Sequence, residues 1–169
     1  MKQTVTFSPP SQIRKANKSL TTNANNTTSV NPLFRITGVV RVIKLYGIVT
    51  TVLGTNHTAA HWRFNDQTAQ PVITLVTGTT LSSAPAGSMI TKFGLVGAAL
   101  TLASAAAGVV SEPTTLETLE WSEFTLTAKA AANSDLEYVY TTSETPTSGV
   151  IQFFLEYEPI SATGAVTVL

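Results

Sequence analysis

The chain has 169 residues, of which 43% are apolar and 12% charged, and it contains no cysteine. This length fits one domain with a full-sized core, and the absence of cysteine excludes disulfides, thiolate metal sites and cysteine nucleophiles. The net charge is zero, but residues 1–63 carry eight basic residues and no acid, whereas residues 64–169 carry two basic and ten acidic residues. Such segregation predicts a basic arm that lies on an acidic partner or on nucleic acid.

Residues 1–31 are rich in Asn, Thr, Ser and Lys, and their isolated apolar residues follow no period of 2 or 3.6. We expect an extended arm, because this segment has too little apolar surface to fold alone. An acidic protein surface is favoured over nucleic acid as its partner, since Phe7 is its one aromatic residue and no nucleic-acid-binding motif follows. The arm residues expected to contact this partner are Lys2, Phe7, Ile13, Arg14, Lys15, Lys18 and Leu20.

Residues 32–169 form the predicted body, in which runs of β-branched and aromatic residues are bounded by Gly, Pro, Asn and Asp. The run 33–53 is too long for one straight strand, so Gly38 and Gly47 are predicted to be bulges or bends. The turn "AANSDL" is predicted to join two strands as a hairpin. Short strands without intervening helices predict an all-β fold, an antiparallel β-sandwich or barrel. A two-sheet sandwich of the jelly-roll kind suits the strand number best. The further strands are expected within 59–66, 71–78, 88–96, 123–130, 136–142 and 149–159.

The closing run "VIQFFLEYEP" carries two carboxylates, Glu156 and Glu158, on one face of a strand, because side chains repeat every second residue. A strand with one buried and one polar face explains this run, so a catalytic carboxylate pair is disfavoured. Phe154 stands among the outward polar residues, which predicts that this face meets a neighbouring subunit. The opposite face is apolar and consists of Ile151, Phe153, Leu155 and Tyr157.

No motif for metal or nucleotide chemistry is present. On a strand, His57 and His61 would lie about 13 Å apart, too far to share an ion. The nucleophile elbow, the dinucleotide-binding glycines and the phosphate-binding loop are all missing. We therefore expect no enzyme activity, no metal and no cofactor. The uncharged segment 94–110 is only weakly hydrophobic, so a buried strand with a small-residue loop is favoured over a membrane span.

The segments "LFRITG" to "GIVTT" and "GVIQFFLEYEP" resemble small virion proteins of tailed bacteriophages, and capsid decoration (cement) proteins are the closest group. The resemblance covers Leu33–Thr51 and Val150–Pro159 best. It implies a jelly-roll-like homotrimer on the outer surface of the phage head that ties neighbouring major capsid proteins together. The low charged fraction, about half of the usual ~25%, fits a subunit that neighbours cover. No apolar stretch follows Lys2, so we expect synthesis in the host cytoplasm without a signal peptide.

Two alternatives belong to other classes of protein. A head-fibre or tail-associated β-sandwich could recognise a host glycan through exposed aromatic side chains around a shallow groove. Trp62 and Trp121 are the residues for that role, and together with Phe154 they are also the candidates for a subunit interface. An enzyme would require Glu156 and Glu158 to line a cleft. Neither a small-molecule substrate nor a membrane partner is expected.

Overall fold

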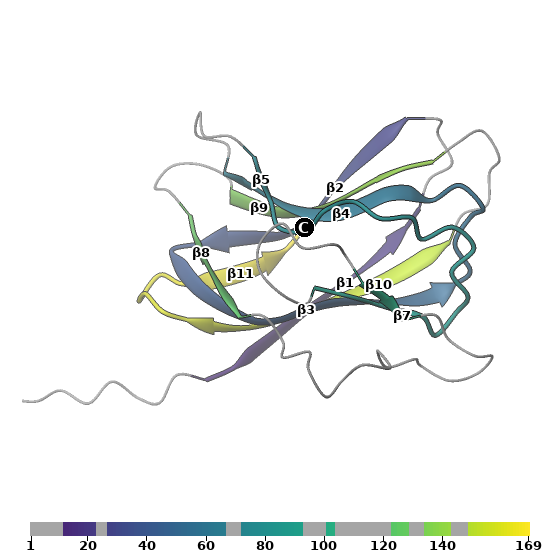
Figure 1. The fold of residues 1–169 in the computed structure, drawn as a ribbon. Helices are drawn as coiled ribbons and strands as arrows, with labels where there is room; N and C mark the ends of the chain where they lie inside the picture. The colour runs from purple at the N-terminus through teal and green to yellow at the C-terminus, as the bar shows by residue number, and fades with distance from the viewer. Residues whose placement is uncertain are drawn as a thin grey trace, which may run out of the picture.

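The computed structural model describes residues 12–22, 27–66, 72–92, 101–103, 123–128, 134–142 and 149–169, with the backbone alone for 101–103. These residues form eleven strands in two antiparallel sheets that pack face to face (Figure 1). Sheet A contains, from edge to edge, β1 (Arg14–Thr21), β10 (Val150–Pro159), β3 (Val39–Thr51), β6 (Met89–Thr91) and β7 (Thr101–Ala103), and β8 (Phe124–Thr127) pairs with β3. Sheet B contains β11 (Ala165–Val168), β2 (Thr28–Thr37), β9 (Ser134–Thr141), β4 (Thr58–Asp66) and β5 (Ile73–Thr74). The predicted all-β sandwich is therefore confirmed.

The antiparallel pairs are nested in the sequence. β4 pairs with β5, β3 with β6, β2 with β9, and β1 with β10. Successive pairs alternate between sheet B and sheet A, so the chain behaves as one long two-stranded ribbon wrapped around the core. This wrapping is that of a jelly roll, in which early strands lie beside late strands. No helix long and apolar enough to cross a membrane occurs in the described part of the chain.

The core is aromatic where the two sheets meet. Trp62 on β4 and Tyr138 on β9 come from sheet B, and both contact Phe153 on β10 of sheet A, with ring centroids 6.2 and 4.8 Å from that of Phe153. All three side chains are fully buried. Burial of one such side chain stabilises the fold by about 2–3 kcal/mol, so this cluster locks the two layers together. On β10 the buried residues alternate with half-exposed ones, as the sequence predicted.

The two glycines of the long run have different roles. Gly38 lies at φ +60° and divides β2 from β3, which confirms the predicted bend. Gly47 lies inside an uninterrupted β3, and the bulges of the β3–β10 pair occur beside Ile43 and Thr50 instead. A Cβ on Gly47 would lie 3.0 Å from Ile151 and 3.1 Å from the ring of Phe153. Gly47 therefore makes room for the large side chains of β10, and its prediction as a bulge or bend is wrong.

Two further predictions about local structure need correction. β8 belongs to sheet A and β9 to sheet B, so the two strands that flank "AANSDL" do not form a hairpin with each other. Arg14–Thr21, expected in an extended arm, is an edge strand hydrogen-bonded to β10, and Thr28–Asn31 belongs to β2. A strand was expected within the Ala- and Gly-rich segment 94–110, and the short strand β7 lies there. Residues 1–11 and 23–26 of the predicted arm lie outside the described residues.

Candidate interaction surface

Opposite charges from the two halves of the chain meet across the strands. Because the ribbon is nested, basic residues of β1 to β4 lie near acidic residues of β9 and β10 and near Glu123, which directly precedes β8. The ion pairs are Lys15–Glu156, Lys44–Glu156, Arg35–Asp135, Arg41–Glu123, Arg41–Glu158 and Arg63–Glu137. The segregation of charge along the sequence therefore becomes complementarity within one folded chain. An external acidic partner is not needed to explain it.

The outer face of sheet A carries two aromatic rings. Phe154 on β10 lies opposite Tyr46 on β3, and the two rings stack with centroids 4.9 Å apart and planes inclined by 14°. Both side chains are half-buried. Asn17 on β1 is the partner of Phe154 on its other side, and Gln152 lies two residues along β10. We call Asn17, Tyr46, Gln152 and Phe154 the sheet A patch.

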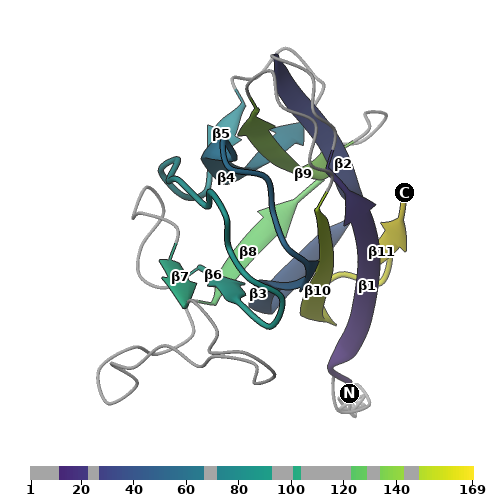
Figure 2. The ribbon, with the colours of Figure 1, turned by 90° about the vertical axis from the view of Figure 1, so that its right-hand side faces the viewer.

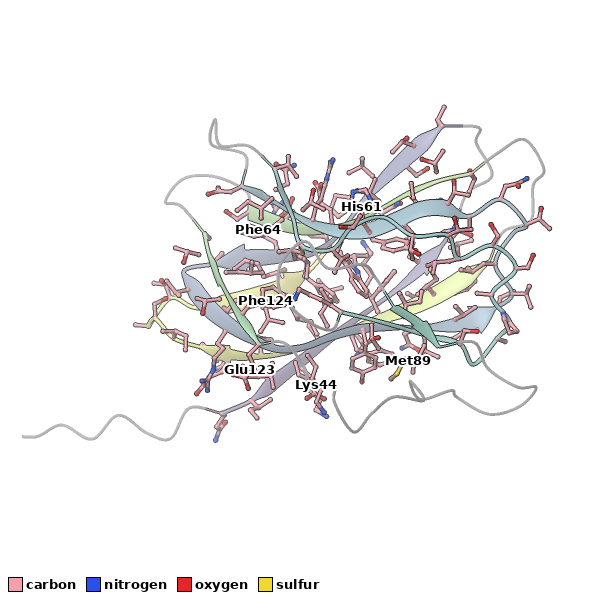
Figure 3. The ribbon with its side chains drawn as sticks, in the orientation of Figure 1. Lys44, His61, Phe64, Met89, Glu123 and Phe124 are labelled. Atoms are coloured by element: carbon pink, nitrogen blue, oxygen red, sulfur yellow. The ribbon has the colours of Figure 1, made fainter. Side chains whose placement is uncertain are left out.

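A shared ion pair borders the sheet A patch. The Glu156 carboxylate lies 3.0 Å from Lys15 Nζ and 4.0 Å from Lys44 Nζ, and Figure 3 shows Lys44 on the side of sheet A that faces away from sheet B. The hydrogen bond to Glu156, and then its charge, raises the pKa of Lys15. Partial burial raises the pKa of Tyr46, with a smaller contribution from Glu156. Two lysines from different strands therefore share one carboxylate at this border.

Glu156 and Glu158 are held by different partners. Glu158 is buried and forms an ion pair with Arg41, which also approaches Glu123. The paired register of β10 with β3 shifts between Glu156 and Tyr157, so the two glutamates face different stretches of β3. In the structure both carboxylates are engaged by guanidinium or ammonium groups.

The outer face of sheet B carries a second polar network that sequence reasoning missed. Arg35 binds Asp135 through two N–H groups, with N···O distances of 2.9 and 3.2 Å. Arg63 Nε donates to Glu137 at 2.5 Å, and Asn65 Nδ2 donates to the other oxygen of Glu137 at 3.0 Å. Asp135 and Glu137 are almost fully buried. The sequence signal was their alternation with Leu136, Tyr138 and Tyr140, which places the two acids together on the outer face.

The predicted arm residues occupy several environments. Arg14 and Lys15 are exposed at the start of β1, and Ile13, just before it, is 59% exposed. Leu20 packs partly against the core. Lys18 points toward sheet B, where Nζ donates to the carbonyl of Pro32 at 2.8 Å, and desolvation lowers its pKa. Lys2 and Phe7 lie outside the described residues.

The two predicted interface residues that the structure describes, Trp62 and Phe154, do not come together. Trp62 is 0% exposed and part of the core, so it offers no surface to a subunit or to a glycan. Phe154 lies on the outer face of sheet A, as predicted. Trp121 lies outside the described residues. The structure adds Tyr46 to Phe154, a partner that the period of a single strand could not indicate.

The two histidines have separate surroundings. His57 is buried, its Nε2 lies 2.9 Å from the hydroxyl of Tyr138, and its ring stacks on Tyr140 at 4.5 Å. Burial lowers the pKa of His57 to about 4. His61 Nδ1 donates to the carbonyl of Ala59 at 2.7 Å. Within the described ranges, no three His, Cys, Asp or Glu side chains gather as a metal site would require.

Comparison of this chain with models of protein families, with curated proteins and with solved structures gave no match in any of the three. The fold class, an antiparallel β-sandwich with jelly-roll wrapping, is therefore the most specific class that the observations define.

Proposed function

We propose that this chain is a structural virion protein that decorates the outer surface of a phage head and cross-links the major capsid protein lattice, as a homotrimer. Three observations support the proposal. The fold is a jelly roll, a class used by many virion subunits. The sequence resembles decoration proteins over Leu33–Thr51 and Val150–Pro159, which form the end of β2, β3 and β10. The third observation, the sheet A patch, is the strongest support for a contact with the capsid.

The sheet A patch has the composition of a protein interface. Two stacked aromatic rings lie between amide side chains, and the nearby charges are bound to one another in ion pairs. Aromatic residues are enriched at interface centres, whereas charged residues are depleted there and lie at the rim. Contacts of this kind are individually modest. Repeated by each copy over a shell, they would bind through avidity and hold neighbouring lattice proteins together.

The alternative function, recognition of a host glycan, also has a jelly-roll precedent in lectins. It has less support from the described residues, because Trp62 is buried and the Tyr46 and Phe154 rings each use one face to contact the other. A catalytic role is not part of the proposal, since Glu156 and Glu158 are engaged in ion pairs.

The proposal is tested by adding the purified protein to phage heads that lack it and measuring co-sedimentation and copy number by quantitative mass spectrometry. We expect many copies spread over the shell, and fewer bound copies with Phe154→Ser or Tyr46→Ser. Thr167→Ala, an exposed change on β11 of sheet B, serves as the matched control. A few copies at one vertex would favour a tail component. Equal occupancy by all variants would show that the sheet A patch does not contact the capsid.

A further inference from the structure

β1 occupies a special position at the edge of the sandwich. Among the described strands its one pairing partner is β10, over eight residues from Arg14 to Thr21. It lies beside β11, the edge strand of sheet B (Figure 2). β1 is the first of the described strands and lies at a sheet edge, so it can leave the sheet without breaking the pairing of any other described strand.

Apolar burial contributes little to holding β1 in place. Ala16 is its only buried residue, at 9% exposure, and Leu20 is half-buried. The contrast with β10 is large, because Ile151, Phe153 and Leu155 are all fully buried there. β1 is therefore bound mainly by the main-chain ladder and by polar side chains. Segments held in this way open at a lower free energy than the core strands of the same protein.

The contacts that β1 does make are specific to its own sequence. Lys15 lies 3.0 Å from Glu156, and Lys18 donates to the carbonyl of Pro32. Immediately after β1, Thr22 N donates to the carbonyl of Gly149 at 2.8 Å, and Gly149 N donates to Thr22 Oγ1 at 2.9 Å. This reciprocal clamp fixes the register of β1 on β10. A β1 strand from a second copy would reproduce every one of these contacts.

The connection to the rest of the chain is long enough for β1 to move away. Five residues, 23–27, separate Thr22 from the start of β2 at Thr28. An extended segment of this length spans roughly 20 Å, which is about twice the ~10 Å between two packed sheets. The linker can therefore carry β1 beyond its own body.

We propose that β1 exchanges between copies of this chain, so that β1 of one copy pairs with β10 of the next. The exchange replaces contacts within a chain with the same contacts between chains, which is a low-cost route to an oligomer. The inference does not rest on a role in a virus particle. It assigns β1, with Thr22, as the donated element and the β10 edge, with Glu156 and Gly149, as the acceptor.

The chain contains no cysteine, so introduced thiols can report the exchange on a clean background. Ser19 and Gln152 face each other across β1 and β10, and neither is buried. A protein with Ser19→Cys is mixed with a protein with Gln152→Cys, incubated at high concentration and then oxidised. A disulfide between them requires β1 of one copy to lie on β10 of the other. We expect a covalent dimer on a non-reducing gel.

The matched control replaces Gln152→Cys by Thr127→Cys, an exposed thiol on β8, which is separated from β1 by β10 and β3. No dimer above background is expected in that mixture. The double variant Ser19→Cys/Gln152→Cys, oxidised at high dilution, should close within one chain and remain a monomer in light scattering at concentrations where the unmodified protein associates. Equal dimer yields in the two mixtures, or none in either while the double variant closes within the chain, would overturn the proposal.

Discussion

Lys15 and Glu156 lie 3.0 Å apart on neighbouring strands, although they come from opposite ends of the chain. Their contact is one of a set in which basic residues of the early strands meet acidic residues of the late strands. The pairs differ in exposure, since the side chain of Lys15 is 74% exposed and that of Glu137 only 4%. They should therefore differ in their contribution to stability.

Removal of one partner of the Arg63–Glu137 ion pair should lower the free energy of unfolding more than removal of both partners. Arg63→Met removes the guanidinium from the buried Glu137 carboxylate and leaves the hydrogen bond from Asn65, and loss of one partner of a buried ion pair costs about 3 kcal/mol. Adding Glu137→Gln to this variant should restore most of the loss, because the buried charge is gone. Urea unfolding measures the free energy of unfolding of the unmodified protein, of Arg63→Met and of the double variant. Lys15→Met, at the exposed pair, is the control, and a loss there equal to that of Arg63→Met would contradict the interpretation.

Gly38 should not tolerate a side chain. At φ +60° an L residue costs about 1–2 kcal/mol, and a Cβ at this position would lie 2.5 Å from Ser161 Oγ and 2.8 Å from the backbone nitrogen of Gly164. We expect Gly38→Ala to lower the thermal midpoint and to perturb the 160–164 turn. Ser161→Ala in the same protein removes one clashing atom, but it also removes the acceptor of the Val39 N–H and leaves the backbone clash, so it should rescue little of the loss in thermal midpoint. A midpoint equal to that of the unmodified protein would show that β2 and β3 can adjust.

Acid should destabilise the fold through His57. Burial lowers its pKa from the ordinary value of 6.5 to about 4 in the folded protein, so the folded state favours the neutral ring. The resulting stabilisation is complete above pH 6.5 and is lost as the pH falls from 6.5 to 4, by about 3 kcal/mol in all. Denaturant unfolding at several pH values measures it.

The control for this experiment is His57→Phe, which cannot titrate. The variant should be less stable at pH 7, because the Tyr138 hydroxyl loses its partner. The difference in stability between the two proteins should then shrink below pH 6.5, since carboxylates contribute equally to both profiles. A constant difference from pH 7 to pH 4 would mean that His57 does not titrate in this range.

Two truncations separate β1 from the residues before it. Removal of residues 1–11 leaves every described contact of β1 in place, so we expect an unchanged unfolding midpoint. Removal of residues 1–22 deletes β1 and its clamp on Gly149 and exposes the β10 edge, which should lower the midpoint and promote aggregation. Circular dichroism and light scattering distinguish the two outcomes. Equal midpoints would show that β1 adds nothing to the fold.

The sequence was informative where one face of a strand is apolar. β10 was predicted with its buried residues because Ile151, Phe153, Leu155 and Tyr157 alternate with polar ones. β1 was missed for the opposite reason, since an edge strand that buries only Ala16 has no apolar period to detect. Its strand conformation depends on β10, a partner from the other end of the chain. β1 is a strand because it pairs with a distant segment, and local sequence patterns carry no information about that pairing.

The candidate surface was predictable only in part. Phe154 was conspicuous as an aromatic residue among outward polar ones, but its stacking on Tyr46 depends on the register of β3 with β10. Trp62 has a polar handle and was expected on the surface, yet the alternation of β4 points it into the core beside Tyr138. The charge segregation was interpreted as a sign of an external partner because the nested topology was unknown. The strand order places these basic and acidic residues next to one another, so they form ion pairs within the chain.

The nested pairing also sets the order in which the protein can fold during synthesis. β4 and β5 can pair as soon as both have left the ribosome, whereas β2 must wait for β9 and β1 must wait for β10. Contacts between such distant segments make folding slow. Until the late strands emerge, the nascent chain carries its positive charge without the acids that will bind it, and that self-repulsion favours an extended, soluble intermediate.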